Sequence, residues 1–257
     1  MTSALRTLLP DLERAWLGVR RPAPASLIDS ASPPCPDPAD LYCTLCGESI
    51  GSGESPDRGC AWCARRRFPW VRLFRLGRYE SPLRDWITSV KFQRDDALAR
   101  ELGRRLASVI LSSSALPLPF DFIVPVPSSP WRRLMRGTDH TAAIAFGLSQ
   151  RLNLPILRPL RRLHHPVQRA VPPSSRRANV RGVFRPARLR LPIPARSRFL
   201  LLDDIATSRS TLIESARALR ALTAAPRASL VVAVLAVADD RSRRSRAQTN
   251  SSPSLDP

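Results

Sequence analysis

The chain has 257 residues, of which 43% are hydrophobic, with five cysteines and a formal net charge of +20. This length allows one or two domains with a substantial core, and no apolar run approaches the ~20 residues that a membrane-spanning helix needs. The first residues carry acids early and lack the basic-then-apolar order of a signal peptide. We therefore expect a cytoplasmic protein without membrane insertion, in which cysteines are more often metal ligands than disulfides.

The positive charge comes almost entirely from arginine. Lysine and arginine together number 41, and Lys91 is the only lysine. Excess positive charge favours binding to polyanions, nucleic acid first, which makes single-stranded DNA a candidate partner. An arginine bias alongside 26 prolines can equally reflect the coding composition of the gene. Charge alone therefore leaves both explanations open.

Residues 1–40 precede the first candidate folded segment. Leucines at helical spacing predict a short amphipathic helix up to about residue 20, and the Pro-, Ala- and Ser-rich residues that follow are typical of a linker. At the other end of the chain, residues 241–257 have too few apolar side chains to bury a core. We expect this C-terminal tail to be disordered.

Residues 41–70 contain two closely spaced cysteine pairs. Cys43 and Cys46 form the first pair, Cys60 and Cys63 form the second, and thirteen residues separate the pairs. This spacing predicts a small zinc ribbon in which four thiolates complete a tetrahedral shell, so that the zinc is structural rather than catalytic. Two redox-active pairs are the alternative. The remaining thiol, at position 35, lies outside the spacing and is interpreted as a spare cysteine.

Residues 71–240 show helical and strand-like patterns that predict an α/β domain. Two amphipathic helices are expected, one starting at Pro82 and one over residues 95–112. A strand is expected over residues 122–127, and an exposed basic loop over residues 160–184 leads into a further strand.

A second basic loop follows the strand that ends at residue 127. It contains Arg132, Arg133 and Arg136, and a helical pattern follows for which Thr138 or Asp139 could be the N-cap. A strand that leads into an arginine-rich loop and a helix is a candidate anion site.

The stretch from residue 199 to residue 211 carries the strongest functional pattern. Four apolar residues run into Asp203 and Asp204, a hydroxyl-rich loop follows, and then come a helical pattern and a second apolar run at residues 230–237. This order predicts a strand–loop–helix–strand unit with parallel strands. Ligands of open parallel sheets bind outside the carboxyl ends of the strands, where these acids are expected to lie as solvated carboxylates.

The chemistry of this stretch suits a sugar phosphate. Hydroxyl groups and free amides at a helix N-terminus favour a phosphate, whereas two adjacent carboxylates favour sugar hydroxyls or a divalent metal such as magnesium. The alternative is that Asp203 and Asp204 only end a strand and that the hydroxyl-rich residues only cap a helix.

Residues 203–211, Asp-Asp-Ile-Ala-Thr-Ser-Arg-Ser-Thr, resemble the phosphoribosyl-pyrophosphate motif of type I phosphoribosyltransferases, which is usually Asp-Asp-hydrophobic-x-Thr-Thr-Gly-x-Thr. Arg209 stands where that motif has glycine. The order of the pieces over roughly residues 40–240 further resembles the ComF family, competence protein F and its relatives. The matching signatures are the four-cysteine ribbon, Pro125-Val126-Pro127 with Arg136-Gly137, then Gln168, Arg176 and Asn179, and finally the loop after Asp203. The family's Phe-Asn-Gln is replaced by Thr138-Asp139-His140.

The resemblance implies a type I phosphoribosyltransferase-like fold, with a parallel sheet and helices on both sides. It implies that the catalytic Asp203 and Asp204 hold the ribose hydroxyls of phosphoribosyl pyrophosphate, directly or through magnesium. It also implies a set of residues that bind the phosphates of this ligand: Thr207, Ser208, Arg209, Ser210 and Thr211 at the 5′-phosphate, and Arg132, Arg133 and Arg136 at the pyrophosphate.

Arg209 departs from the motif in a loop where backbone amides approach a phosphate closely. Glycine suits such a position because it accepts positive φ and has no side chain in the way. We expect the Arg209 guanidinium to point to solvent and its steric cost to dominate. On this expectation Arg209→Gly tightens ligand binding about tenfold.

Two functional hypotheses follow. The first is an enzyme that transfers a phosphoribosyl group to an unidentified acceptor. The second is a non-catalytic protein of DNA uptake that senses nucleotide-like ligands, binds single-stranded DNA and works with the uptake machinery. The paired acids favour the first hypothesis, whereas Arg209, the net charge and the ribbon favour the second.

Overall fold

The computed structural model describes residue 37 and residues 41–51, 53–64, 66–93, 95–113, 120–128, 139–163, 182–187 and 192–238. The expected N-terminal helix, nearly all of the linker and the C-terminal tail lie outside the described residues. So do three candidate ligand-binding arginines and three signature residues: Arg132, Arg133, Arg136, Gln168, Arg176 and Asn179. No helix in the described part of the chain is long and apolar enough to cross a membrane.

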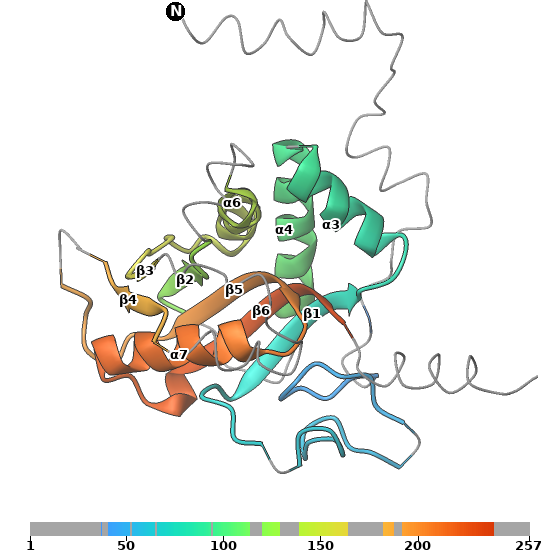
Figure 1. Ribbon diagram of the computed structural model, residues 1–257, viewed down its shortest axis with the longest axis horizontal. Helices are drawn as coiled ribbons and strands as arrows, with labels where there is room; N and C mark the ends of the chain where they lie inside the picture. Colours follow the sequence, from blue (N-terminus) through green and yellow to red (C-terminus); the bar gives the residue numbers. More distant parts are fainter. Residues whose placement is uncertain are drawn as a thin grey trace, which may run out of the picture. The chain divides into compact units, whose positions relative to one another are not determined.

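A four-stranded parallel sheet forms the centre of the described fold, in the order β1-β6-β5-β2 (Figure 1). Its strands are β1 (Arg72–Arg78), β2 (Phe122–Pro125), β5 (Phe199–Ala206) and β6 (Leu230–Val237). Every residue of β6 is buried, as expected for an internal strand of a parallel sheet that is covered on both faces. The α/β class and the parallel sheet predicted from the sequence are confirmed.

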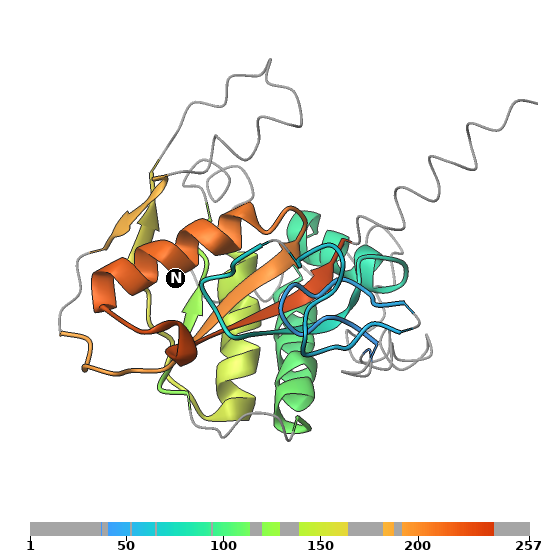
Figure 2. The same cartoon turned by 90° about the horizontal axis from the view of Figure 1, so that it is seen from below.

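Helices cover both faces of this sheet (Figures 1 and 2). α3 (Leu83–Phe92), α4 (Asp96–Leu111) and α6 (His140–Leu152) lie on one face, and α7 (Ser210–Thr223) lies on the other. α7 connects β5 to its parallel neighbour β6, which confirms the expected strand–loop–helix–strand unit. β3 (Leu160–Arg162) and β4 (Phe184–Pro186) form a separate antiparallel pair, and the short 3₁₀ helix η2 (Arg227–Ser229) precedes β6.

Close packing between α4 and α6 depends on two glycines. A Cβ at Gly103 would overlap the backbone of Ile144, and a Cβ at Gly147 would overlap the backbone of Arg100. The side chain of Asp139 accepts a hydrogen bond from an amide in the first turn of α6 and is therefore the N-cap of this helix. Together these contacts fix the start of α6 near the carboxyl end of β5.

The sequence patterns do not predict β1, because arginines interrupt its apolar residues. Arg75, in the middle of the strand, has a side chain that is only 1% exposed, and its Nη2 atom lies 2.7 Å from Asp37 Oδ2. A buried cation is tolerated when a carboxylate pairs with it. This partner lies much earlier in the chain, so that a local pattern cannot reveal it.

The cysteine segment, residues 41–70, packs on the face of the sheet that carries α7 (Figure 2). Its buried side chains belong to the same hydrophobic core as those of the sheet and of α7. The indole of Trp70 donates a hydrogen bond to the carbonyl of Leu45 at 2.8 Å, and the amide of Leu73 in β1 donates one to the carbonyl of Thr44 at 2.6 Å. The predicted four-cysteine segment before the sheet is confirmed. The first hydrogen bond lies within the segment, and the second anchors the segment to the first strand.

Candidate functional site

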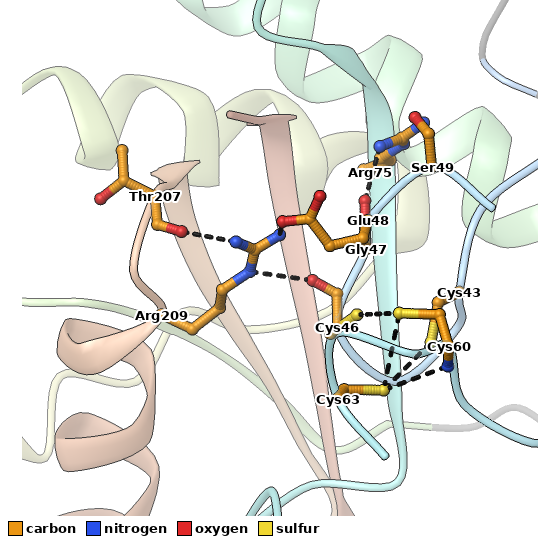
Figure 3. Close-up of polar contacts among 10 residues, drawn as sticks. All are labelled: Cys43, Cys46, Gly47, Glu48, Ser49, Cys60, Cys63, Arg75, Thr207 and Arg209. Atoms are coloured by element: carbon orange, nitrogen blue, oxygen red, sulfur yellow. Dashed lines mark hydrogen bonds and ion pairs between the residues drawn. The ribbon is translucent and has the colours of Figure 1, made fainter. Parts of the chain in front are cut away.

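The four cysteines predicted to bind zinc come together in one buried cluster (Figure 3). The Sγ atoms of Cys43 and Cys63 are 3.6 Å apart, those of Cys46 and Cys60 are 3.5 Å apart, and those of Cys60 and Cys63 are 3.9 Å apart. Sulfurs around a tetrahedral zinc with bonds of ~2.3 Å lie about 3.8 Å from one another. The spacing of the sulfurs therefore fits a tetrahedral zinc site.

The chemistry of the cluster also favours a structural metal. All four cysteines are at most 3% exposed, and burial raises the pKa of Cys63 to about 12. Four sulfurs that converge on one point form a closed metal shell, whereas a redox pair needs only its own two sulfurs to face each other.

We expect the purified protein to contain one zinc ion per chain, and elemental analysis measures this directly. Cys60→Ser/Cys63→Ser should lose the metal and should fold poorly, because metal binding contributes folding free energy. Cys35→Ser is the matched control, since it removes a thiol outside the spacing of the two pairs, and it should keep its zinc. Full zinc content in the double variant would contradict the assignment.

The two acids of the motif lie inside β5 rather than after it. β5 continues to Ala206, and Asp203 pairs in register with Val234 of β6. Because successive strand residues point to opposite faces, Asp204 faces α3 and α6, and Asp203 faces the side that carries α7. Both acids lie in the carboxyl-terminal half of the strand, close to the edge where parallel sheets bind ligands.

Asp204 is bound by two side chains that the sequence patterns do not single out. Lys91 Nζ, near the end of α3, and His140 Nε2, at the start of α6, each lie 2.8 Å from Asp204 Oδ2. The Asp204 side chain is only 13% exposed, so the expectation of a solvated carboxylate is wrong for this residue. One signal in the sequence could have pointed to Lys91: it is the only lysine, and its compact ammonium differs from the planar guanidinium of arginine.

The two neighbouring acids have opposite pKa shifts. Burial, followed by the charge of Asp204, raises the pKa of Asp203 to about 8. Burial also acts to raise the pKa of Asp204, but the hydrogen bond to His140 and the charge of Lys91 outweigh it and lower that pKa. These opposite shifts favour an ionised Asp204 and a protonated Asp203. Divergent pKa values in adjacent carboxyl groups are typical of functional sites.

The loop between β5 and α7 can accept an anion. Thr207 and Ser208 are exposed, and Ser210 and Thr211 are partly exposed. Ser208 Oγ lies 3.0 Å from Ser210 Oγ, so that the hydroxyls gather at the start of α7. The N-cap residue of α7, Arg209, makes no side-chain capping hydrogen bond, and the Ser210 amide donates a long hydrogen bond of 3.4 Å to Ser208 Oγ. The positive end of the helix is directed at this loop.

Arg209 faces the cysteine segment and not the solvent (Figure 3). Its backbone has φ 61°, in the left-handed region for which glycine is suited. Its side chain is 0% exposed, and Nη2 lies 2.7 Å from Oε1 of Glu48, whose side chain is also 0% exposed. The expected solvent-directed guanidinium is therefore wrong. The buried carboxylate of Glu48 holds the guanidinium inside the protein. The expectation that Arg209→Gly tightens ligand binding assumed a solvent-directed side chain and therefore loses its basis.

The structure thus brings Asp203, Asp204 and the loop of residues 207–211 to one edge of the sheet, beside the cysteine segment. The three arginines expected at the pyrophosphate are outside the described residues. Sequence patterns missed three side chains of this region: Lys91, His140 and Glu48. The first two bind a motif acid, and the third binds the motif arginine.

Comparisons with known proteins identify relatives. No family model matches the chain. The chain is 31% identical over 186 residues to competence protein F of Haemophilus influenzae, covering 70% of this chain and 79% of that protein. It is 30% identical over 182 residues to DNA utilization protein YhgH of Escherichia coli, covering 69% and 77% respectively. A solved adenine phosphoribosyltransferase matches at 16% identity with a TM-score of 0.36, over 60% of this chain and 78% of that one, a similarity too low to establish a shared fold.

The identity and coverage of the curated relatives show that the chain belongs to the competence protein F family.

Proposed function

We propose that the chain binds phosphoribosyl pyrophosphate together with magnesium and transfers the phosphoribosyl group to an acceptor. The observation that carries this proposal is the Asp203–Asp204 pair in β5, followed two residues later by a hydroxyl-rich loop and the N-terminus of α7. Acids suited to a ribose and an anion site suited to its 5′-phosphate thus lie a few residues apart. This is the order of the motif that residues 203–211 resemble.

Each group has its own task in this proposal. The hydroxyls of the loop and the amides at the start of α7 would bind the 5′-phosphate, and the two acids would hold the ribose hydroxyls, directly or through magnesium. Lys91 and His140 keep Asp204 ionised and in place. Magnesium beside Asp203 would favour loss of its proton, since a nearby positive charge lowers the pKa of a carboxyl group.

The transfer would break the bond between the anomeric carbon and the pyrophosphate oxygen. A nucleophilic atom of the acceptor would form the new bond to this carbon, and pyrophosphate would leave. Positive charge develops on the sugar and negative charge on the leaving group, so the protein contributes mainly positioning and electrostatic stabilisation. Arg132, Arg133 and Arg136 are the residues proposed to stabilise the pyrophosphate.

Calorimetry with phosphoribosyl pyrophosphate, with and without magnesium, tests the proposal. Wild-type protein should bind the ligand with magnesium and much more weakly without it. Asp203→Asn should lose the magnesium-dependent part and keep its fold at neutral pH, where Asp203 is already protonated. Asp204→Asn should also weaken binding, but it additionally costs stability because it removes the charged partner of Lys91.

Asp121→Asn is the matched control. Asp121 lies at the opposite end of the sheet, where its carboxylate accepts a hydrogen bond from the amide of Arg198. Its replacement removes one carboxylate and should leave ligand binding unchanged. Wild-type protein that does not bind the ligand, or Asp203→Asn that binds it as tightly as wild type with magnesium, would disprove the proposed site.

A second candidate function is DNA handling, which the names of the relatives favour: competence protein F and DNA utilization protein. In this proposal the chain acts with the DNA-uptake machinery, binds single-stranded DNA through its net charge of +20 and uses the phosphoribosyl site as a sensor. Ligand binding without release of pyrophosphate would favour this function over transfer. Both functions fit the cytoplasmic location expected from the sequence.

Binding to single-stranded DNA should be weak and steeply dependent on salt. Each phosphate contact releases counterions, so that a protein with several contacts should lose about tenfold or more in affinity between 50 and 200 mM salt. Fluorescence anisotropy with a labelled oligonucleotide measures this slope. An affinity that stays flat over this range would mean that the positive charge reflects composition and does not serve DNA binding.

A further inference from the structure

Arg209 connects the loop of residues 207–211 to both cysteine pairs. On the side of the first pair, its Nε atom donates a hydrogen bond to the carbonyl of Cys46 at 3.0 Å, and its Nη2 atom lies 2.7 Å from Glu48 Oε1 (Figure 3). On the side of the second pair, the ring of Trp62 lies 4.4 Å from the guanidinium carbon. The guanidinium therefore occupies a socket built by both pairs.

The same guanidinium also binds the loop to which it belongs. Its Nη1 atom donates a hydrogen bond to the carbonyl of Thr207, so that the side chain folds back along the loop (Figure 3). The backbone at Arg209 is left-handed, with φ 61°. A non-glycine residue keeps such a conformation only when its surroundings over-determine it. Here the surroundings belong to the cysteine segment.

The charge of Arg209 is not presented to a ligand. The side chain is fully buried, and the carboxylate of Glu48, which is also fully buried, pairs with it. Because the Arg209 side chain is buried and already paired, it can hold the loop in shape but is not available to a ligand.

We propose that Arg209 is a positioning residue, which locks the phosphate-binding loop of residues 207–211 to the metal-bound cysteine segment. The loop then keeps its ligand-binding shape only while both cysteine pairs are held together. This inference rests on the proposed function for the identity of the ligand, but the positioning role itself can be measured without any ligand.

The metal matters because the two halves of the socket belong to different cysteine pairs. Cys46 and Glu48 belong to the first pair and the turn after it, and Trp62 lies inside the second pair. The four sulfurs come from both halves and lie within 4.8 Å of one another, so a zinc ion held by them would join the two halves. Without the metal the halves can separate, and the guanidinium then loses the partners that fix the loop. Glycine, which the motif that residues 203–211 resemble has at this position, would have no side chain to make this connection.

A loop released from Arg209 must be ordered again each time a ligand binds. Ordering the backbone of a single residue is enough to weaken binding by about tenfold. Glu48→Ala removes the partner of Arg209 without changing the loop sequence. We expect it to raise backbone amide hydrogen exchange over residues 207–211 about tenfold or more and to weaken phosphoribosyl-pyrophosphate binding about tenfold. Glu48→Gln keeps an acceptor for the guanidinium and should give an intermediate result.

Arg75→Ala is the matched control. Arg75 is as buried as Arg209 and binds the same turn after Cys46, through Gly47 and Ser49, but it reaches that turn from β1 (Figure 3). Its replacement keeps the Glu48 carboxylate and should raise exchange over residues 207–211 much less than Glu48→Ala does. Unchanged exchange of this loop in both Glu48 variants, or an equal rise in Arg75→Ala, would overturn the proposal.

Hydrogen exchange of full-length wild-type protein before and after zinc removal by a chelator tests the link to the metal. After zinc removal from wild type, we expect hydrogen exchange over residues 207–211 to rise much more than exchange over β6, which reports on the fold as a whole. In Glu48→Ala the loop is already released, so zinc removal should raise its exchange little further. A loop that stays protected after zinc removal, or that loses protection only together with β6, would count against the link. If wild-type protein fails to bind phosphoribosyl pyrophosphate, the proposed function fails, whereas the exchange experiment still decides the role of Arg209.

Discussion

Replacing Glu48 by leucine is expected to cost about 3–5 kcal/mol of unfolding free energy, because it leaves the Arg209 guanidinium in the core without its counter-charge. Both side chains of this ion pair are 0% exposed. The other partners of the guanidinium, which are two backbone carbonyls and the ring of Trp62, are uncharged. Urea unfolding of wild type and Glu48→Leu at the same pH measures the difference.

The double variant Glu48→Leu/Arg209→Met should recover most of this loss. Apolar side chains of similar volume often replace a buried ion pair at little cost, since no charge must then be desolvated. Glu101→Leu serves as a surface control: Glu101 pairs with Arg104 and Arg105 on the partly exposed side of α4, and its loss should cost less than about 1 kcal/mol. Equal losses in the single and double variants would show that packing, and not charge, dominates at Glu48.

The unfolding free energy is also expected to fall as the pH rises from about 4 to about 8, because of Asp203. The folded pKa of this residue, about 8, is above its ordinary value of 3.8, so the folded protein retains a proton that the unfolded chain has lost. This contribution is fully present below pH 3.8 and disappears as the pH rises through about 8. One pKa unit corresponds to about 1.4 kcal/mol. Because Asp203 keeps part of its solvent exposure, we expect a total loss of about 1–3 kcal/mol.

Asp203→Asn isolates this effect, since the amide cannot ionise. The variant should differ little from wild type at about pH 4 and should become progressively more stable than wild type up to about pH 8, beyond which the difference stays constant. Asp204 does not interfere in this range, because its lowered pKa contributes stability that is lost only as the pH falls below its ordinary range. Chemical unfolding of both proteins at a series of pH values gives the difference directly. A difference that stays constant with pH would contradict the raised pKa.

Local spacing was sufficient for the features whose residues are neighbours in sequence. The two cysteine pairs predicted a four-sulfur cluster, since each pair forms one tight turn and only two such turns must meet. The apolar run ending in Asp203 and Asp204, followed by hydroxyls and a helical pattern, predicted the β5–α7–β6 unit. The left-handed backbone at Arg209 also followed from the sequence, because the motif has glycine at that position.

Features that depend on distant partners escaped the sequence. Arg75 interrupts the apolar pattern of β1 and hides this strand, although Asp37 pairs with it in the fold. Lys91 and His140 look like ordinary residues at the end of one helix and the start of another, until α3 and α6 bring both to Asp204. Each of these pairs joins charged or polar groups whose burial is favourable only because the partner is present.

The sequence by itself therefore determined the parallel α/β architecture, the cysteine cluster and the order of strand, acids, hydroxyl-rich loop and helix, because periodicity and spacing act over one or two elements. Only the tertiary structure decided the state of these groups: which acid of the pair is protonated, and which way Arg209 points. The physical reason is that pKa values and the directions of charged side chains depend on burial and on charges within a few ångströms. Here those charges come from Lys91 in α3 and Glu48 in the cysteine segment, far from the motif in sequence.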